Sequence, residues 1–223
     1  MKEKIKNLSF RVPQIIGLIA ILVGGAILLK SGTWVFRNFY RDDAESYYKR
    51  GDAKHDLGDY RGAIQDYSKA IEINPNYAEA YNNRGAAKVD LQDYGGAIQD
   101  FNKAIEINPN YAGAYNNRGA AKVDLQDYGG AIQDYNKAIE INPNLALAYI
   151  GRGLAKYHLQ DYGGTIQDFN KAIEINPNFA GAYVIRGRAK FQLGDKDGAC
   201  LDWSKAGKLG YSKAYDMIKE FCK

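Results

Sequence analysis

Cysteine, histidine and proline are scarce in this chain of 223 residues, and each shortage excludes a class of protein. Two cysteines cannot form a disulfide-dense scaffold or a zinc site of four thiolates. Two histidines cannot form a histidine-rich metal site. Five prolines, together with 46% hydrophobic residues, argue against intrinsic disorder. An ordered chain with no resident metal is therefore expected.

An excess of positive charge is also lacking outside the N-terminal segment. Residues 1–41 carry seven cationic side chains and one anionic side chain, whereas the rest of the chain carries 23 and 25. The net charge of +4 therefore comes from the N-terminal segment. The remainder is slightly acidic, which argues against a surface that binds nucleic acid there.

One long hydrophobic run lies near the N-terminus. Residues 12–29 carry no charge, follow a basic flank at residues 1–11, and precede a linker at residues 30–43 that contains Trp34 and Phe36. A membrane-spanning helix needs about 20 apolar residues, so this run of eighteen is just long enough. Aromatic residues beside such a run anchor it among the headgroups. The sequence predicts a single-pass N-terminal transmembrane helix at residues 12–29.

Two properties of this segment stay open. A cleaved signal peptide is the alternative to an anchor and would release an exported periplasmic protein, although the run ends in Leu28-Leu29-Lys30 without a small-x-small cleavage site. Four cationic residues precede the run and three follow it. The positive-inside rule therefore gives only a weak preference for a repeat domain on the outer, periplasmic side.

Everything after residue 43 repeats with a period of 34 residues. The units span residues 44–77, 78–111, 112–145, 146–179 and 180–211, and residues 212–223 follow them. Each unit reads as two helices with apolar residues at helical spacing. An Asp-Tyr pair such as Asp93-Tyr94 separates them, and its Asp is suited to cap the second helix. An Asn-Pro-Asn sequence ends the second helix, because proline prevents its continuation.

The small and aromatic residues within each unit resemble those of the tetratricopeptide repeat. Counted from the first alanine of each unit, position 4 is Tyr, position 8 is Gly and position 27 is Ala in all five units. Position 24 is always aromatic, position 20 is Ala in all units but the fourth, and position 32 is Pro in all units but the fifth. The resemblance covers residues 44–211. It implies an all-α, right-handed superhelical solenoid of five helix-turn-helix repeats. The fifth unit departs from the pattern at Lys196 and Tyr211, and residues 212–223 show the amphipathic pattern of a capping helix.

Three charged positions recur in every unit. Position 11 is always Lys. Position 7 is Arg50, Arg84, Arg118, Arg152 and Arg186, and position 23 is Asp66, Asp100, Asp134, Asp168 and Asp202. We expect each Asp to pair with the Arg, or with the Lys, within or between units. Charges that recur together in this way are typical of a scaffold rather than of a site.

The two cysteines lie in the last unit and in the capping segment. Cys200 replaces an Ile of the other units, so a buried, reduced thiol is one interpretation. A disulfide is the other. Antiparallel helices joined near Gly210 would bring Cys200, ten residues before the turn, level with Cys222, twelve after it. Such a bridge would fix the cap and imply an oxidising compartment.

No motif for catalysis or for a cofactor is visible. His55 and His158 have no cluster of carboxylate or thiolate ligands near them in the sequence. Gly-Gly pairs such as Gly95-Gly96 are not followed by the Gly-Lys-Ser/Thr of a phosphate-binding loop. No Ser-His-Asp or Cys-His arrangement is apparent. We therefore expect a protein that is not an enzyme, with no cofactor and no small-molecule substrate.

The resemblance implies a concave groove, lined by the first helix of each unit, in which a polypeptide partner binds. The candidate residues are polar in units one to three: Tyr48, Asp52, His55, Asp56, Asn82, Asn83, Asp90, Asn116, Asn117 and Asp124. They are mostly apolar or aromatic in units four and five: Ile150, Leu154, Tyr157, His158, Val184, Arg188 and Phe191. Asparagines can hold an extended backbone, and an apolar patch with one Arg is typical of a binding hot spot. Packing against the cap is the other explanation of the patch.

Family members that bind chaperone tails hold a terminal carboxylate with Lys at unit positions 5 and 2. Neither position is Lys in any unit here. Of the residues of that carboxylate clamp, only its asparagine at position 6 is matched, by Asn83 and Asn117, so an adaptor of that type is excluded. Analogy with membrane-tethered repeat proteins suggests an assembly factor for a membrane complex. Self-association of the near-identical units into a structural envelope protein is the alternative.

Overall fold

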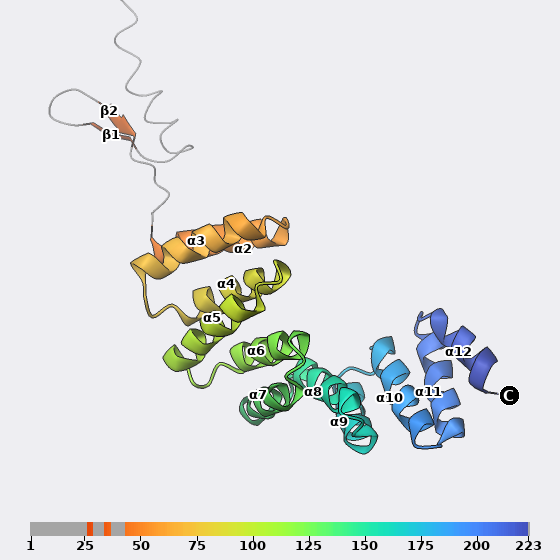
Figure 1. The fold of residues 1–223 in the computed structure, drawn as a ribbon. Coiled ribbons are helices and arrows are strands. Elements are labelled where there is room, and N and C mark those ends of the chain that lie inside the picture. Colours follow the sequence, from red (N-terminus) through yellow and green to blue (C-terminus); the bar gives the residue numbers. More distant parts are fainter. Residues whose placement is uncertain (1–25, 29–33, 37–42, 223) are drawn as a thin grey trace, which may run out of the picture.

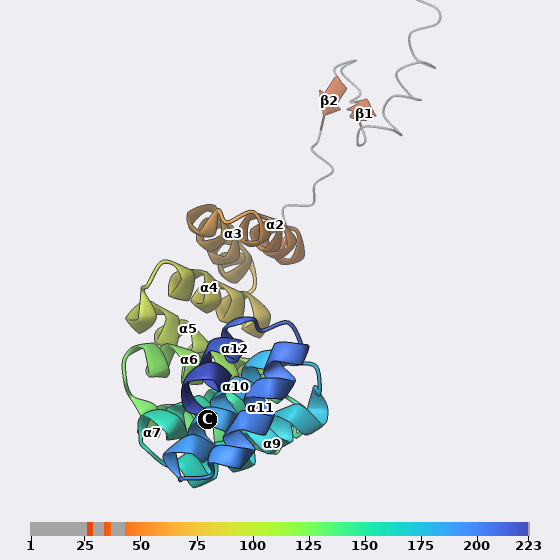
Figure 2. The ribbon, with the colours of Figure 1, turned by 90° about the vertical axis from the view of Figure 1, so that its right-hand side faces the viewer.

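The computed structural model describes residues 26–28, 34–36 and 43–222. Within 43–222 it contains eleven helices, which Figure 1 shows as a curved row of two-helix layers running from α2 to α12. Figure 2 shows the row after a turn of 90°, with its C-terminal end toward the viewer. The prediction of an all-α repeat array is confirmed for residues 43–222.

Two helices form in every unit, as the sequence predicts, and one more follows the last unit. The first helices are α2 (Ala44–Asp56), α4 (Ala78–Asp90), α6 (Ala112–Asp124), α8 (Ala146–His158) and α10 (Ala180–Gln192). The second helices are α3 (Tyr60–Ile73), α5 (Tyr94–Ile107), α7 (Tyr128–Ile141), α9 (Tyr162–Ile175) and α11 (Lys196–Lys208). The capping helix is α12 (Lys213–Phe221).

The N-terminal segment differs from the prediction where it is described. A helix is predicted through residue 29, but strand β1 (Ala26–Leu28) pairs there in antiparallel fashion with β2 (Trp34–Phe36). Short apolar runs suit a strand as well as a helix, and their periodicity does not distinguish the two. The rest of residues 12–29 lies outside the described residues. Among the helices of the described ranges, none combines the length and the apolar character that crossing a bilayer requires.

The predicted aspartate caps are confirmed at each second helix. In unit two, Asp93 Oδ1 accepts a hydrogen bond of 3.0 Å from the backbone N–H of Gly96. A side chain at Gly96 would overlap this carboxylate in its present position, so the Asp93 side chain would have to shift. At the other end of the helix, Asn108 Oδ1 accepts from the N–H of Asn110 at 3.1 Å. This turn, with proline between the two asparagines, ends the helix.

Glycine at unit position 8 lets the two helices of a unit approach closely. In unit two, a methyl group on Gly85 would lie 2.7 Å from Cε1 of Phe101, so the ring packs directly on the backbone of the first helix. The capping helix has no second helix of its own. If the repeat is continued from Ala214, Phe221 occupies position 8, where the five units have glycine. Its ring packs on Trp203, with 5.9 Å between ring centroids.

The first helices form the inner wall of the curved row. They contact one another directly along the array, α2 with α4, α4 with α6, α6 with α8 and α8 with α10. Their exposed sides therefore form one continuous surface that runs through all five units, and any ligand of this surface would contact several units at once.

The turn between the two helices of a unit contains a residue with positive φ. It is glycine in units one and five (Gly58 and Gly194) but Gln92, Gln126 and Gln160 with φ of 62° in the middle units. A side chain in this region costs about 1 kcal/mol, and glycine adopts it freely. We expect Gln126→Gly to raise the free energy of unfolding by roughly 0.5–1 kcal/mol in urea denaturation.

Two variants at the same turn serve as controls for this prediction. Gln126→Ala keeps the Cβ and should give no gain, whereas Gly58→Gln should lower the free energy of unfolding. Equal stability of the Gly and Ala variants at position 126 would show that backbone strain is not the cause.

Candidate functional site

Three hollows of the described surface lie along the inner wall. A polar one of about 300 Å³ lies at α2 and α4. An apolar one of about 230 Å³ lies between α8 and α10. A third of about 400 Å³ lies between α10 and the cap. Most residues that line them come from the first helices, so the hollows are parts of one groove.

The N-terminal hollow is a hydrogen-bonded polar cluster. It is lined by Asp52, His55, Asp56, Tyr67, Asn83 and Ala86. The Tyr67 hydroxyl donates to Asp52 Oδ1 at 2.7 Å, and Asn83 Nδ2 donates to the same oxygen at 2.9 Å. Burial raises the pKa of Tyr67, and its hydrogen bond to Asp52 raises that pKa further. Burial and the Asp52 charge also raise the pKa of Tyr48, so both phenols stay protonated at neutral pH.

Four asparagines of units two and three form a hydrogen-bonded chain along the inner wall. Asn116 Nδ2 donates to Asn117 Oδ1 at 3.3 Å, Asn117 Nδ2 to Asn82 Oδ1 at 3.0 Å, and Asn82 Nδ2 to Asn83 Oδ1 at 3.0 Å. The Asn83 amide donates in turn to two side chains of unit one. Asn82 is only 6% exposed. Asn82 and Asn83 therefore hydrogen-bond to the scaffold, and their role in holding a peptide stays a prediction.

This chain of amides stops where the fourth unit begins. Asn116 Oδ1 is buried and has no hydrogen-bond partner among the described residues. The fourth unit has Gly151 at the position of Asn83 and Asn117, and the ring of Tyr135 fills the space that a side chain would need there. Gly151 thus marks the boundary between a polar N-terminal half and an apolar C-terminal half of the groove.

Among the remaining polar candidates, His55 lines the N-terminal hollow, whereas Asp124 and His158 lie outside the hollows. His55 Nε2 is 2.9 Å from Asp90 Oδ2, a contact between units one and two. Asp124 is exposed and does not line any of the three hollows. His158 is also outside the hollows, and its ring stacks on Tyr128 with 4.8 Å between centroids.

The middle hollow brings together four predicted residues. Its lining includes Ile150, Leu154, Val184 and Arg188, with Ile185, Phe169, Phe179, Gly181 and Tyr211. Val184 is 3% exposed and forms part of the wall. Sequence reasoning missed Phe179 and Tyr211. The replacement of the usual proline by Tyr211 was the available signal for the latter.

The third hollow extends the groove beyond the repeats onto the cap. Three predicted residues line it, Tyr157, Arg188 and Phe191, together with Gln192, Trp203, Met217, Glu220 and Phe221. Phe191 packs on Trp203 and Phe221, with centroid distances of 5.8 and 5.0 Å. Phe191 therefore serves the docking of the cap as well as the groove. The cap residues were missed because the groove was expected to end with the fifth unit.

The recurring charges form a network in every unit. In unit three, Asp134 Oδ1 lies 2.5 Å from Arg118 Nη2 and Asp134 Oδ2 lies 2.8 Å from Lys122 Nζ. Arg118 Nη1 also donates to Asn102 Oδ1 of the preceding unit at 2.6 Å. One carboxylate thus binds both cations of its own unit, and the arginine joins two units. The other units repeat the pairs Arg50–Asp66, Arg84–Asp100, Arg152–Asp168 and Arg186–Asp202.

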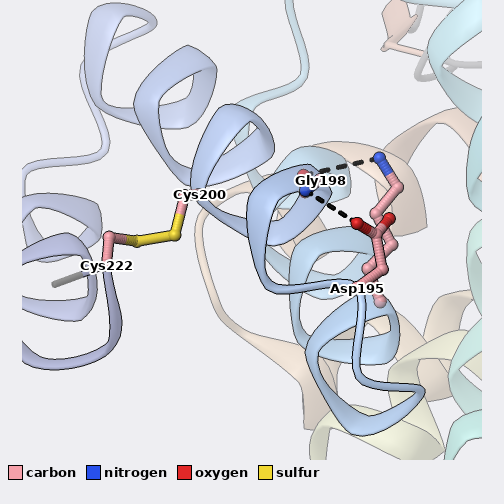
Figure 3. The surroundings of a disulfide bond; sticks show 5 residues. Asp195, Gly198, Cys200 and Cys222 are labelled. Carbon is pink, nitrogen blue, oxygen red and sulfur yellow. Dashed lines mark hydrogen bonds between the residues drawn. A yellow bond between two sulfur atoms is a disulfide. The ribbon is translucent and has the colours of Figure 1, made fainter.

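A disulfide joins the last repeat to the cap. Cys200 of α11 is bonded to Cys222, which follows α12, and their Cα atoms are 5.9 Å apart. Figure 3 shows the bridge spanning the space between the two helices. It lies close to the third hollow, because Trp203 on α11 and Phe221 on α12 line that hollow. Elsewhere in the described part of the chain, no group of three potential metal ligands comes together.

Comparison with protein families gives a consistent result. The tetratricopeptide repeat profile matches residues 78–111, 112–145 and 146–179, and a second TPR repeat profile matches residues 51–91. A search of curated proteins gave no match. Among solved structures 423 chains match, so the fold alone does not indicate a particular partner.

Three of the similar structures show how far the likeness extends. YrrB is described as a TPR protein with an unusual peptide-binding site. It is 22% identical, with a TM-score of 0.65, and the match covers 80% of this chain and 93% of that one. This likeness supports the fold alone. The first TPR of Spaghetti (RPAP3), bound to the HSP90 peptide SRMEEVD, is 30% identical over 52% of this chain and 92% of that one, with a TM-score of 0.51. The MamA protein is 30% identical over 77% of this chain and 94% of that one, with a TM-score of 0.67. Sequence profile, repeat length and structure agree, and the chain belongs to the tetratricopeptide repeat family.

Proposed function

We propose that this protein is a non-catalytic scaffold that binds a polypeptide partner in the apolar C-terminal half of its groove. The observation that carries the proposal is the hollow between α8 and α10, whose walls include Ile150, Leu154 and Ile185. A concave apolar surface with a few polar groups is the usual composition of a recognition site. A 30% identical family member was solved with a peptide bound, which supports a polypeptide as the ligand.

The polar half of the groove is a weaker candidate for the main contact. Its asparagines already satisfy one another, and Asn83 donates to both Tyr48 and Asp52. A peptide would have to break these hydrogen bonds to make its own, so little net free energy would be gained. The C-terminal half offers apolar surface instead, whose burial is favourable in itself.

Leu154→Asp tests this proposal. The charged side chain would enter the apolar hollow, and we expect the amount of partner recovered with the full-length protein from detergent-solubilised membranes to fall at least tenfold. Ala120→Asp is the matched control, because Ala120 occupies the same helix position in unit three and is exposed. Quantitative mass spectrometry should show unchanged recovery with the control. Equal recovery with both variants would place the binding site elsewhere.

We also propose that residues 12–29 hold the array at a membrane, with the repeats on the outer side, where the partner is a component of a membrane complex under assembly. The absence of charged side chains from residues 12–29 supports an apolar anchor, and because residues 26–28 form β1 the proposed anchor is not a helix that continues through residue 29. The Cys200–Cys222 disulfide supports an oxidising compartment. Alkaline extraction of membranes should leave the protein in the pellet with its full intact mass. A soluble protein that lacks the N-terminal residues would instead be an exported, cleaved form.

A further inference from the structure

We infer that the partner segment bound at units four and five carries an acidic side chain between an aliphatic and an aromatic side chain. This inference rests on the proposed function and specifies the chemistry of the ligand. It is carried by Arg188, by its place between the two apolar hollows, and by the charges of the rest of the groove.

Arg188 differs from the other arginines of the first helices. Arg186, two residues earlier on α10, binds the buried Asp202 with Nη2 2.5 Å from Oδ1, and its side chain is 16% exposed. Arg188 is exposed and has no ion-pair or hydrogen-bond partner within the described ranges. The fourth unit has Leu154 at the same helix position and unit one has Asp52, so this cation is specific to the last unit. An unpaired guanidinium on the inner wall is available to an anionic ligand.

Arg188 is the residue that both apolar hollows share. A chain that places one side chain in each hollow passes Arg188. A carboxylate at that point would accept charge-assisted hydrogen bonds, flanked by apolar walls that reduce its exposure to water. Glu220 also lines the cap hollow, so a second acid in that hollow would meet a like charge. These contacts place the acid of the ligand beside Arg188 rather than beyond it.

The two hollows differ in the side chain that they suit. The hollow of about 230 Å³ is the smaller of the two, so an aliphatic side chain fits it better than a ring, and its walls combine Ile150, Leu154 and Ile185 with the rings of Phe169, Phe179 and Tyr211. The hollow of about 400 Å³ is walled by the rings of Tyr157, Phe191, Trp203 and Phe221 and by Met217. Aromatic side chains gain from edge and offset contacts with such rings. An aliphatic group in the first hollow and an aromatic group in the second is therefore the favoured arrangement.

The charges of the N-terminal half set the position of the acid along the groove. Asp56, Asp90 and Asp124 occupy the same position in units one to three and are all exposed. The fourth and fifth units have His158 and Gln192 there, so this row of carboxylates ends before the apolar half. An acidic ligand is repelled by the row and attracted by Arg188, which favours binding at the C-terminal end.

Fluorescence polarisation with the full chain in detergent tests the inference. The probes are labelled peptides that contain Leu, a central residue and Phe in that order. Two, three or four Gly/Ser residues separate each of these from the next, the N-termini are blocked and the C-termini are amidated. The central residue is Glu, Gln or Lys, so the Glu peptide carries the one carboxylate of the series. We expect the Glu peptide to bind at least tenfold more tightly than the Gln and Lys peptides.

Variants of Arg188 then test whether its side chain binds the acidic residue of the peptide. Arg188→Gln should abolish the preference for Glu, so that the Glu and Gln peptides bind equally tightly, and Arg188→Glu should reverse the preference in favour of Lys. Arg61→Gln is the matched control, because Arg61 is also exposed but lies on α3, away from the hollows. It should keep the preference for Glu.

The outcomes separate this inference from the proposed function. Equal binding of the three peptides, lost in Leu154→Asp, would overturn the requirement for an acid and leave the groove as the binding site. Failure of all peptides to bind would overturn the inference as stated, and partner recovery with Leu154→Asp and Ala120→Asp would still decide the proposed function. A preference for Glu that survives Arg188→Gln would also overturn it, because another cation would then be responsible.

Discussion

Asp134→Asn is expected to lower the free energy of unfolding by about 3 kcal/mol. The Asp134 side chain is 5% exposed and binds Arg118 and Lys122 at 2.5 and 2.8 Å. Asparagine keeps the shape of the carboxylate but not its charge. The two cations, one turn apart on α6, would then face each other without a counter-charge in a largely buried site. The lower part of the usual range applies, because Lys122 is 21% exposed and can turn toward water.

The effect should extend beyond the third unit. Arg118 also binds Asn102 of the second unit, so its displacement weakens the interface between the two units. Repeat arrays are held together by contacts between neighbours, and a weak central interface lets the halves unfold separately. Urea denaturation followed by circular dichroism should therefore show both a lower midpoint and a shallower slope.

Two substitutions elsewhere in the array calibrate this result. Asp124→Asn changes an exposed carboxylate on the same helix α6 and should alter the free energy of unfolding by less than about 0.5 kcal/mol. Asp66→Asn removes the equivalent carboxylate of the first unit, where Arg50 is 54% exposed and has no preceding unit, and should cost less than Asp134→Asn. Equal midpoints for Asp134→Asn and Asp124→Asn would show that the network adds no net stability.

The scaffold could be predicted because each of its features is local and occurs up to five times in the sequence. The capping Asp, the Asn-Pro-Asn stop and the glycine under the aromatic ring each depend on residues close in the sequence. Comparison of the five units with one another also served as an internal sequence alignment, in which position 7 is always Arg, position 11 always Lys and position 23 always Asp. The sharing of Asp134 between Arg118 and Lys122 did not follow from sequence, because it depends on the angle between the two helices.

The groove could be predicted only in part, because its contents depend on how successive units are placed. Asn83 and Asn117 were identified as groove residues, but their pairing with other side chains follows from the distance between neighbouring first helices. The wall formed by Tyr211 and Phe221 depends on how α12 folds back over the last unit. At the N-terminus, β1 (Ala26–Leu28) could not be told from a helix, because a short apolar run suits both.

Reduction of the Cys200–Cys222 bond is expected to weaken the docking of α12 by about 3 kcal/mol, the loop-closure value for a bridge that spans 22 residues. The helix has nine residues and one buried residue, Ala214. A helix this short is not stable without tertiary contacts. We therefore expect the reduced cap to detach at urea concentrations that leave the repeats folded.

Tryptophan fluorescence reports this step directly. Trp203 is 1% exposed and packs against Phe221, so loss of α12 would expose it to water and shift its emission to the red. The measurement uses a Trp34→Phe background, which leaves Trp203 as the one tryptophan of the chain. A Cys200→Ala, Cys222→Ala variant should show the early shift with or without reductant. A single transition at the same urea concentration in the oxidised and reduced protein would show that packing alone holds the cap.

The same bridge connects stability to binding. Phe221 lines the hollow that we assign to the aromatic group of the ligand, and Arg188 lines the same hollow. Loss of the cap would remove that hollow but leave Ile150 and Leu154, which lie on α8, in place. At a urea concentration that detaches the reduced cap and leaves the repeats folded, reduction should therefore weaken binding of the Leu-Glu-Phe peptide to the level of a peptide with Ala in place of Phe, and should not abolish binding. Complete loss of binding on reduction would mean that the cap also holds α10 in position.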